Sequence, residues 1–236
     1  MDLRKENYSL KGFWLSLFWL LFTTVYSQND CIVRVALEPI KTSEKKTASV
    51  VSQSEFSYYT SWKDIDKGLV ADNANANIAF TKQGLSNILK FTNFGFNIPE
   101  GSIIHGIKLK INGRSEGQGN IQDYLVKLSN GNNKTGKGYN SKNVWAKGSL
   151  NKTFYYGYED DNWGAFWNSS SINSSNFGLE IQIMNSQSKP VNAFLDNVEI
   201  EIFYTPLATY CLTDCFPVYV DPIDGASSYQ WHFPDG

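Results

Sequence analysis

The chain has 236 residues, with 21 basic and 23 acidic side chains, and aromatic residues make up 15% of it. Its formal net charge of −2 excludes a strongly basic protein that would bind nucleic acid through concentrated positive charge. We therefore expect no nucleic-acid partner.

The N-terminus predicts a secretory signal. Arg4, Lys5 and Lys11 precede an apolar run at 12–21, and the small residue Ser27 follows. The apolar stretch of about 14 residues is shorter than the roughly 20 needed to span a bilayer, so a membrane anchor is the weaker alternative. We expect cleavage after Ser27, a secreted or cell-surface location, and no membrane span in the mature chain.

Residues 28–47 are expected to form an N-terminal segment and a linker. Lys41, Lys45 and Lys46 cluster between Pro39 and Ala48. Such a short run of like charges is typical of a solvated connection rather than a binding site.

The middle of the chain predicts β-structure. Apolar and polar residues alternate strictly at 107–111, 179–183 and 198–202, which is the pattern of half-buried antiparallel strands. Less regular strands are expected at 78–81, 88–94, 124–128 and 154–158, and turn-forming clusters occur at 97–102, 112–120, 130–138 and 168–176. No helical apolar period is sustained over three turns. The pattern predicts an all-β fold, a jelly-roll-like antiparallel sandwich of about seven to nine strands over 48–206.

The segment 207–236 predicts the start of a second β-domain. It contains turn residues and one alternating strand around Tyr229, Trp231 and Phe233, too little apolar surface to fold alone. We expect the sequence to be a fragment of a longer protein.

Three cysteines, Cys31, Cys211 and Cys215, leave an odd number. On an extended strand Cys211 and Cys215 would have Cα atoms roughly 13 Å apart, so a disulfide between them requires a turn at 213–214. Pairing with each other, with Cys31, or with a cysteine beyond Gly236 all remain open. Two thiolates without nearby histidines do not supply four zinc ligands.

Catalysis is not expected within these residues. The two histidines, His105 and His232, lie in no nucleophile or metal motif, and no phosphate-binding glycine loop is present. We therefore predict that this part of the protein is not an enzyme.

An acidic run at Glu159, Asp160 and Asp161 is the candidate metal site. Calcium takes six to eight oxygen ligands, and three adjacent carboxylates on a loop could supply some of them. The alternative is a solvated turn before Trp163. Calcium is the one cofactor that this sequence suggests.

Aromatic residues supply the candidate ligand site. Trp163 and Trp167 lie in a loop-like stretch, and Tyr155 and Tyr156 are neighbours on an expected strand, so one of the two should face outward. Exposed rings can stack on the apolar faces of sugars, whereas the alternative is that large rings fill the sandwich core. We predict polysaccharide or cell-surface glycan contact through Trp163, Trp167 and Tyr156.

Two resemblances follow from these segments. The order of the segments at 92–101, 104–111, 123–128, 156–164, 172–181 and 196–205 resembles a recurrent β-sandwich module of bacterial surface proteins and phage structural proteins. The segment 218–236 resembles the first strands of a PKD-like, immunoglobulin-type domain of Bacteroidetes surface proteins. These resemblances imply a structural or adhesive role and no chemistry.

Three functions are therefore weighed. The first is a non-catalytic module for adhesion or glycan contact in a larger surface protein. The second is an accessory module of a secreted hydrolase whose catalytic domain lies beyond residue 236, and the third is a passive structural spacer. The loop aromatics and the lack of catalytic motifs favour the first.

Overall fold

The computed structural model describes residues 24–27, 30–35, 42–130, 138–139, 143–206 and 208–211, with the backbone alone at 24–27, 30–35, 42 and 208–211. The chain divides into two compact units. One is Ala36–Leu207, and the other combines Met1–Val35 with Ala208–Gly236.

The second of these units contains a three-stranded antiparallel sheet. Strand β2 (Asp30–Val35) pairs with β1 (Thr24–Ser27) on one side and with β13 (Ala208–Cys211) on the other. The predicted disulfide between Cys211 and Cys215 and the predicted PKD-like domain lie outside the described residues, apart from the backbone of β13.

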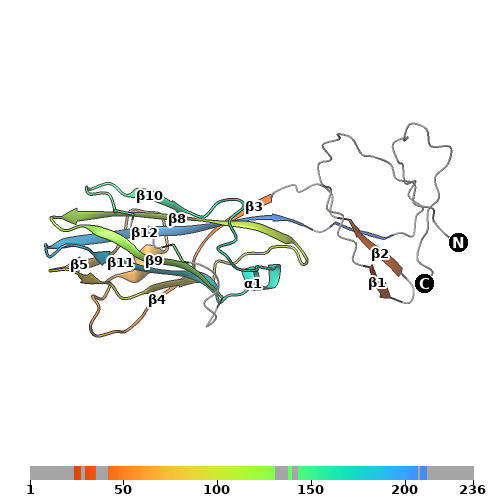
Figure 1. The fold of residues 1–236 in the computed structure, drawn as a ribbon, viewed down its shortest axis with the longest axis horizontal. Helices are drawn as coiled ribbons and strands as arrows, with labels where there is room; N and C mark the ends of the chain where they lie inside the picture. The colour runs from red at the N-terminus through yellow and green to blue at the C-terminus, as the bar shows by residue number, and fades with distance from the viewer. Residues whose placement is uncertain are drawn as a thin grey trace, which may run out of the picture. The chain divides into compact units, whose positions relative to one another are not determined.

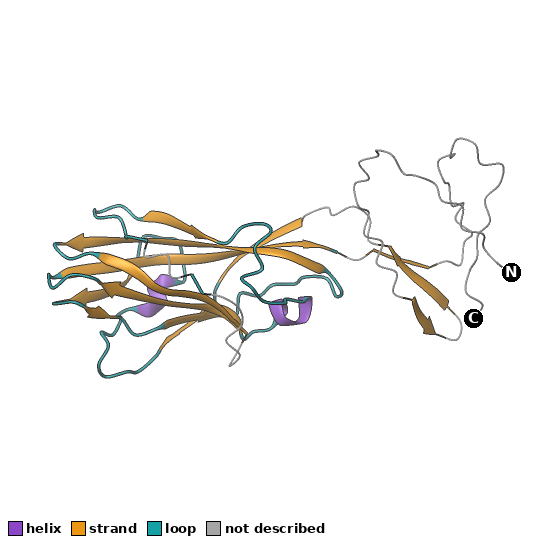
Figure 2. Ribbon diagram, in the orientation of Figure 1, coloured by secondary structure: helices purple, strands orange, loops and turns teal. Residues whose placement is uncertain are grey.

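The unit Ala36–Leu207 is a sandwich of two five-stranded antiparallel sheets (Figures 1 and 2). The first sheet contains β3 (Thr42–Thr47), β5 (Ala76–Phe80), β8 (Ile103–Gly117), β10 (Lys152–Tyr156) and β12 (Val191–Thr205). The second contains β4 (Val50–Gln53), β6 (Gly84–Leu85), β7 (Leu89–Thr92), β9 (Ile121–Asn130) and β11 (Phe177–Asn185). The predicted all-β antiparallel sandwich is confirmed.

Each sheet is built around a long central strand. In the first sheet β12 pairs with β8 on one side and with β5 and then β3 on the other, while β10 pairs with the far edge of β8. In the second sheet β11 pairs with β9 on one side and with β7 and β6 on the other, and β4 extends the sheet from β7.

The core follows from the alternation in the sequence. Ile107, Leu109 and Ile111 of β8 are completely buried, while the intervening Lys108 and Lys110 are half-buried on the opposite face. The same alternation runs through β11 and β12. The strands predicted at 107–111, 179–183 and 198–202 are therefore confirmed, as are those that correspond to β5, β7, β9 and β10.

The predicted turn cluster at 112–120 is wrong over 112–117, because β8 continues through Gly117, and the turn to β9 occupies only 118–120. Residues with a preference for turns are held in the strand by pairing with β12 from Asn112 onward. Gly113 allows the Trp145 ring to pack directly against β8, since a Cβ atom at this position would lie 2.6 Å from that ring. Tertiary contacts thus override the local turn preference.

Two other expectations fail locally. The predicted linker at 28–47 contains strands, and β3 forms an edge of the first sheet by pairing with residues 199–204 of β12. The predicted turn cluster at 168–176 contains the short helix α1 (Ser169–Asn173), which begins at a reciprocal cap between Asn168 and Ser171. Within the described residues there is also one 3₁₀-helix, η1 (Ile65–Gly68).

Within the part of the chain that the structure describes, no helix has both the length and the apolar character needed to cross a membrane.

Gly178→Ala is predicted to destabilise the sandwich. A Cβ atom at Gly178 would lie 2.1 Å from the carbonyl oxygen of Phe91, so β7 and β11 would have to separate. We expect a loss of about 1–3 kcal/mol in the free energy of unfolding, measured by urea denaturation. Gly84→Ala is the matched control, because no atom beyond Gly84 and its two chain neighbours lies within 4 Å of its Cβ position. Equal stability of the two variants would contradict the register in which β7 pairs with β11.

Candidate functional site

The two loop tryptophans predicted to bind glycan belong to the core. Trp163 has no exposed surface, and its indole Nε1 donates a hydrogen bond of 2.7 Å to the carbonyl oxygen of Ile107. Trp167 is also buried and donates from Nε1 to the carbonyl oxygen of Asn162 at 2.9 Å. The expectation that these rings are exposed is wrong, because each finds both apolar contacts and a partner for its N–H inside the fold.

Tyr155 and Tyr156 point to opposite faces of β10, as the alternation predicted. Tyr155 is 58% exposed, whereas Tyr156 is buried and its hydroxyl donates to Oδ2 of Asp123 at 2.5 Å. Burial, followed by the Asp123 carboxylate, raises the pKa of Tyr156. Tyr156, which the sequence suggested as a ligand residue, therefore faces the core, and the outward-facing ring is Tyr155.

The three acidic residues at 159–161 do not lie in the same environment. Glu159 and Asp160 are exposed, whereas Asp161 accepts hydrogen bonds from the backbone N–H of Trp163 at 2.8 Å and from the hydroxyl of Tyr139. Burial and this hydrogen bond raise the pKa of Tyr139. In the described ranges, no group of three or more His, Cys, Asp or Glu side chains is placed to hold a metal ion. Asp161 thus orders its loop, and the structure gives the calcium hypothesis no support.

The loop at 54–61, which follows β4, carries an exposed group of aromatic rings that we call the aromatic loop. Phe56, Tyr58 and Tyr59 contact one another, with ring centroids 5.6 Å apart for Phe56–Tyr58 and Phe56–Tyr59 and 4.4 Å apart for Tyr58–Tyr59. Phe56 is 44% exposed and Tyr58 is 74% exposed. The three rings therefore pack against one another at the protein surface, next to the edge strand β4 of the second sheet.

The two ends of the aromatic loop are clamped together. Gln53 donates from Nε2 to the carbonyl oxygen of Trp62 at 3.1 Å and accepts at Oε1 from the Trp62 backbone N–H at 3.0 Å. The Trp62 ring is buried and donates from Nε1 to the carbonyl oxygen of Asn87 at 3.2 Å. The Gln53 side chain therefore pairs with the Trp62 backbone as a neighbouring strand would, and this pairing closes the loop. The buried Trp62 ring joins this end of the loop to the core.

Asn87 fixes the interior of the aromatic loop. Its side chain is buried and accepts at Oδ1 from the backbone N–H of Phe56 at 3.2 Å, and its Nδ2 donates to Oγ of Ser61 at 3.0 Å. The backbone N–H of Ser54 also donates to the carbonyl oxygen of Ile88 at 2.9 Å. Because these bonds join the loop to the connection between β6 and β7, the rings are presented on an ordered support.

A hollow of about 270 Å³ lies beside Phe56, the one ring of the three that lines it. It is lined by Gln53, Ser54, Glu55, Phe56, Ser57, Ser61 and Asn87. The lining combines an aromatic face with hydroxyl, amide and carboxylate groups, and it contains no cationic side chain among the described residues. Such a surface can stack on an apolar ring face and exchange hydrogen bonds with hydroxyl groups at its edge.

A sequence signal for the aromatic loop was present. Three rings at 56, 58 and 59 lie within the serine-rich stretch SEFSYYTS, and Trp62 follows immediately. Polar residues that separate aromatic ones predict partial exposure, whereas Trp163 is followed by Gly164 and Ala165, and Trp167 is preceded by Phe166. The three rings were nevertheless absent from the predicted ligand residues, and Trp62 beside them is the ring that the fold buries.

Asn87→Ala is predicted to loosen the aromatic loop. The backbone N–H of Phe56 and the hydroxyl of Ser61 would lose their partly buried hydrogen bonds to the Asn87 side chain, so we expect about 1–3 kcal/mol of destabilisation and faster amide hydrogen exchange at 54–62. Asn192→Ala is the control, since Asn192 is exposed on β12. Unchanged exchange in the Asn87 variant would show that this residue does not hold the loop.

Trp163→Ala is predicted to act on stability. Removing a completely buried indole should cost about 3–5 kcal/mol, which thermal or urea denaturation would detect. Phe166→Ala is the matched control in the same loop, because Phe166 is 89% exposed and its loss should change stability by less than about 0.5 kcal/mol. A stable Trp163→Ala variant would contradict the core position of the ring.

No family model and no curated protein matches the sequence. Solved structures with a related arrangement include carbohydrate-binding modules. The module TmCBM61, solved in complex with β-1,4-galactotriose, is 9% identical, with a TM-score of 0.36 over 66% of this chain and 90% of that chain.

Two further structures come from Clostridium thermocellum. The CBM22-1 and GH10 modules of its endo-1,4-β-D-xylanase 10B, complexed with xylohexaose, are 14% identical, with a TM-score of 0.34 over 66% of this chain and 28% of that chain. A family 11 carbohydrate-binding module with a mixed-linked tetrasaccharide is 11% identical, with a TM-score of 0.31 over 72% of this chain and 94% of that chain. Structural similarity at these identities and TM-scores does not assign the protein to a family or identify a ligand.

Proposed function

We propose that the sandwich is a non-catalytic glycan-contact module that binds through the aromatic loop. The observation that carries this proposal is the group of three rings, Phe56, Tyr58 and Tyr59, held at the surface, with Phe56 lining a polar hollow. The proposal rests on these residues of the chain itself.

The arrangement of the rings supports a ligand-binding role. Large rings exposed to water keep apolar surface that a ligand can cover. Covering it would stabilise the complex by roughly 25 cal/mol for each Å² removed from water. The clamp at Gln53 and Trp62 keeps the loop ordered without a ligand, so little conformational entropy is lost when one binds. Tyr58, the most exposed of the three rings, is then the main stacking surface.

The lining of the hollow favours an uncharged sugar. Serine hydroxyls and the amide of Gln53 can donate to and accept from sugar hydroxyls, and Glu55 can accept from them. Glycoside cleavage in most families requires a pair of carboxyl groups across the bond, and Glu55 is the only carboxylate among the described lining residues. The site thus suits binding of a neutral polysaccharide without cleavage.

We also propose that the module belongs to a secreted or cell-surface protein, in which glycan contact serves adhesion. In the alternative, the module is attached to a hydrolase and the same site holds the enzyme on its substrate. A domain with catalytic groups beyond residue 236 would favour that alternative. A passive spacer would bind no glycan at all.

Tyr58→Ala is predicted to weaken glycan binding. Loss of the stacking ring should reduce affinity at least about tenfold, measured by affinity electrophoresis against a panel of neutral polysaccharides that includes galactan, xylan and mixed-linkage glucan. The folded state should be unaffected because Tyr58 is 74% exposed. Tyr158→Ala removes a comparably exposed ring, 68% accessible, from another loop and should bind as the original protein does.

Either of two results would overturn the proposal. Binding by the Tyr58→Ala variant at the original affinity would exclude the aromatic loop as the site. Absence of binding by the original protein to every polysaccharide of the panel would favour the spacer.

A further inference from the structure

The outer face of the first sheet carries a second hollow with a different chemistry. Its volume is about 150 Å³, and it lies over the middle of β8 where this strand pairs with β10 and β12. Its lining residues are Lys45, Lys108, Lys110, Tyr155, Glu199 and Glu201. None of these residues belongs to the aromatic loop.

The lysines of β8, Lys108 and Lys110, lie opposite glutamates of β12. Lys110 is directly opposite Glu199 in the register, and Lys108 is opposite Glu201, but neither lysine makes an ion pair with another described residue. Glu201 instead pairs with Lys45 of β3, with 3.6 Å between Oε1 and Nζ. Lys108 and Lys110 lie two residues apart on the same face of β8, so an anion placed between them would be attracted by both ammonium groups.

Tyr155 closes one side of this hollow. Its ring is 58% exposed, and Nζ of Lys108 lies 5.0 Å from the ring centroid. The contact holds a cation beside an exposed aromatic face. A sugar stacked on Tyr155 would therefore bring its ring substituents close to Lys108.

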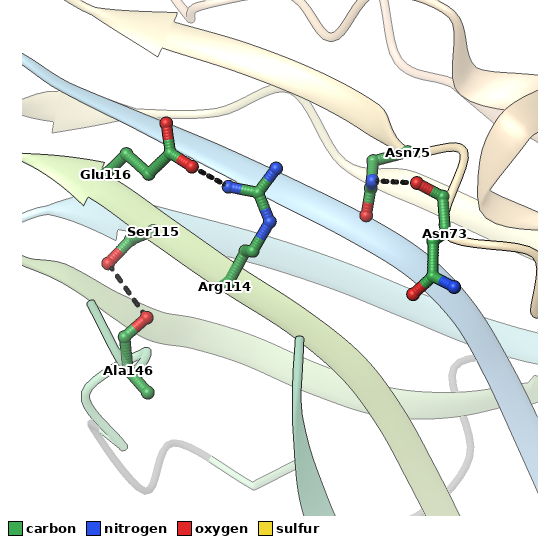
Figure 3. Close-up of polar contacts among 6 residues, drawn as sticks. All are labelled: Asn73, Asn75, Arg114, Ser115, Glu116 and Ala146. Atoms are coloured by element: carbon green, nitrogen blue, oxygen red, sulfur yellow. Dashed lines mark hydrogen bonds and ion pairs between the residues drawn. The ribbon is translucent and has the colours of Figure 1, made fainter. Parts of the chain in front are cut away.

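Cationic and planar groups continue along the same face of β8. Asn112 donates from Nδ2 to Oδ1 of Asn197 at 2.6 Å, and beyond it the Arg114 guanidinium lies 3.9 Å from the centre of the Phe194 ring. Figure 3 shows Arg114 joined to Glu116 on one side of β8, while Ser115 points to the other side, toward Ala146. Lys108, Lys110 and Arg114 thus form a row of cations spaced by multiples of two residues.

We propose that this face of the first sheet is a second saccharide site, selective for sugars that carry an anionic substituent. The pyranose ring stacks on Tyr155, Lys108 and Lys110 bind the carboxylate or sulfate group, and Glu199 and Glu201 accept hydrogen bonds from hydroxyl groups. Arg114 extends the site along β8 for an oligomer. This site is independent of the aromatic loop, whose lining contains no cationic side chain.

The test is to titrate the whole chain with two anionic polymers and their uncharged counterparts. Polygalacturonate is compared with its uncharged methyl ester, and dextran sulfate is compared with dextran, which separates a carboxylate from a sulfate ligand. We expect binding to at least one anionic polymer, and a loss of affinity when NaCl is raised from about 0.05 M to about 0.5 M, because salt screens the charges. The double variant Lys108→Gln with Lys110→Gln should bind this polymer at least about tenfold more weakly.

Three further variants identify the cause of a loss. Lys108→Arg with Lys110→Arg keeps the charges and should retain binding. Lys127→Gln removes a half-buried lysine that is opposite Glu180 on the second sheet, and it should have no effect. Tyr58→Ala should bind the anionic polymer normally, so failure of one site is distinguished from failure of the other.

The proposal is overturned if neither anionic polymer binds. It is also overturned if the double glutamine variant binds the anionic polymer as the original protein does, or if the Lys127→Gln variant loses as much affinity as the double variant.

Discussion

The pairing of β8 with β12 is the constraint on which the rest of the sandwich depends. These two fifteen-residue strands run together from Ile103 opposite Thr205 to Gly117 opposite Val191. Because side chains alternate between the two faces of a strand, burying Ile107, Leu109 and Ile111 forces Lys108 and Lys110 outward. Core formation and the cationic face of the first sheet are therefore two consequences of one register.

The aromatic residues divide between two roles according to whether their polar atoms find partners inside. Trp145 and Tyr156 both donate to the buried carboxylate of Asp123, from Nε1 at 2.8 Å and from the hydroxyl at 2.5 Å, and Trp163 donates to the backbone of β8. Tyr58 and Tyr155 remain largely exposed. A buried indole or phenol without a partner would be costly, so hydrogen bonding within the core selects which rings are enclosed.

The two proposed surfaces differ in chemistry because they arise from different parts of the fold. The aromatic loop is an irregular segment that is closed by Gln53 and Trp62 and tied to the core through Asn87, and its hollow contains no lysine or arginine among the described residues. The hollow over β8 lies on regular sheet, where alternation places charged residues side by side. One protein module thus presents a neutral and a charged contact surface.

The sequence alone determined the all-β class and the inward face of the main strands, because a period of two residues is a local property of the chain. It did not determine which rings are exposed. Trp163 lies in a loop yet is enclosed, while Phe56 and Tyr58 lie in a loop and remain accessible, and the difference depends on contacts with distant residues such as Ile107 and Asn87. The residues 112–117 likewise read as a turn but extend β8, since pairing with β12 outweighs their local preference. Only the tertiary structure decided these points, because it alone brings together the partners that bury a ring or continue a strand.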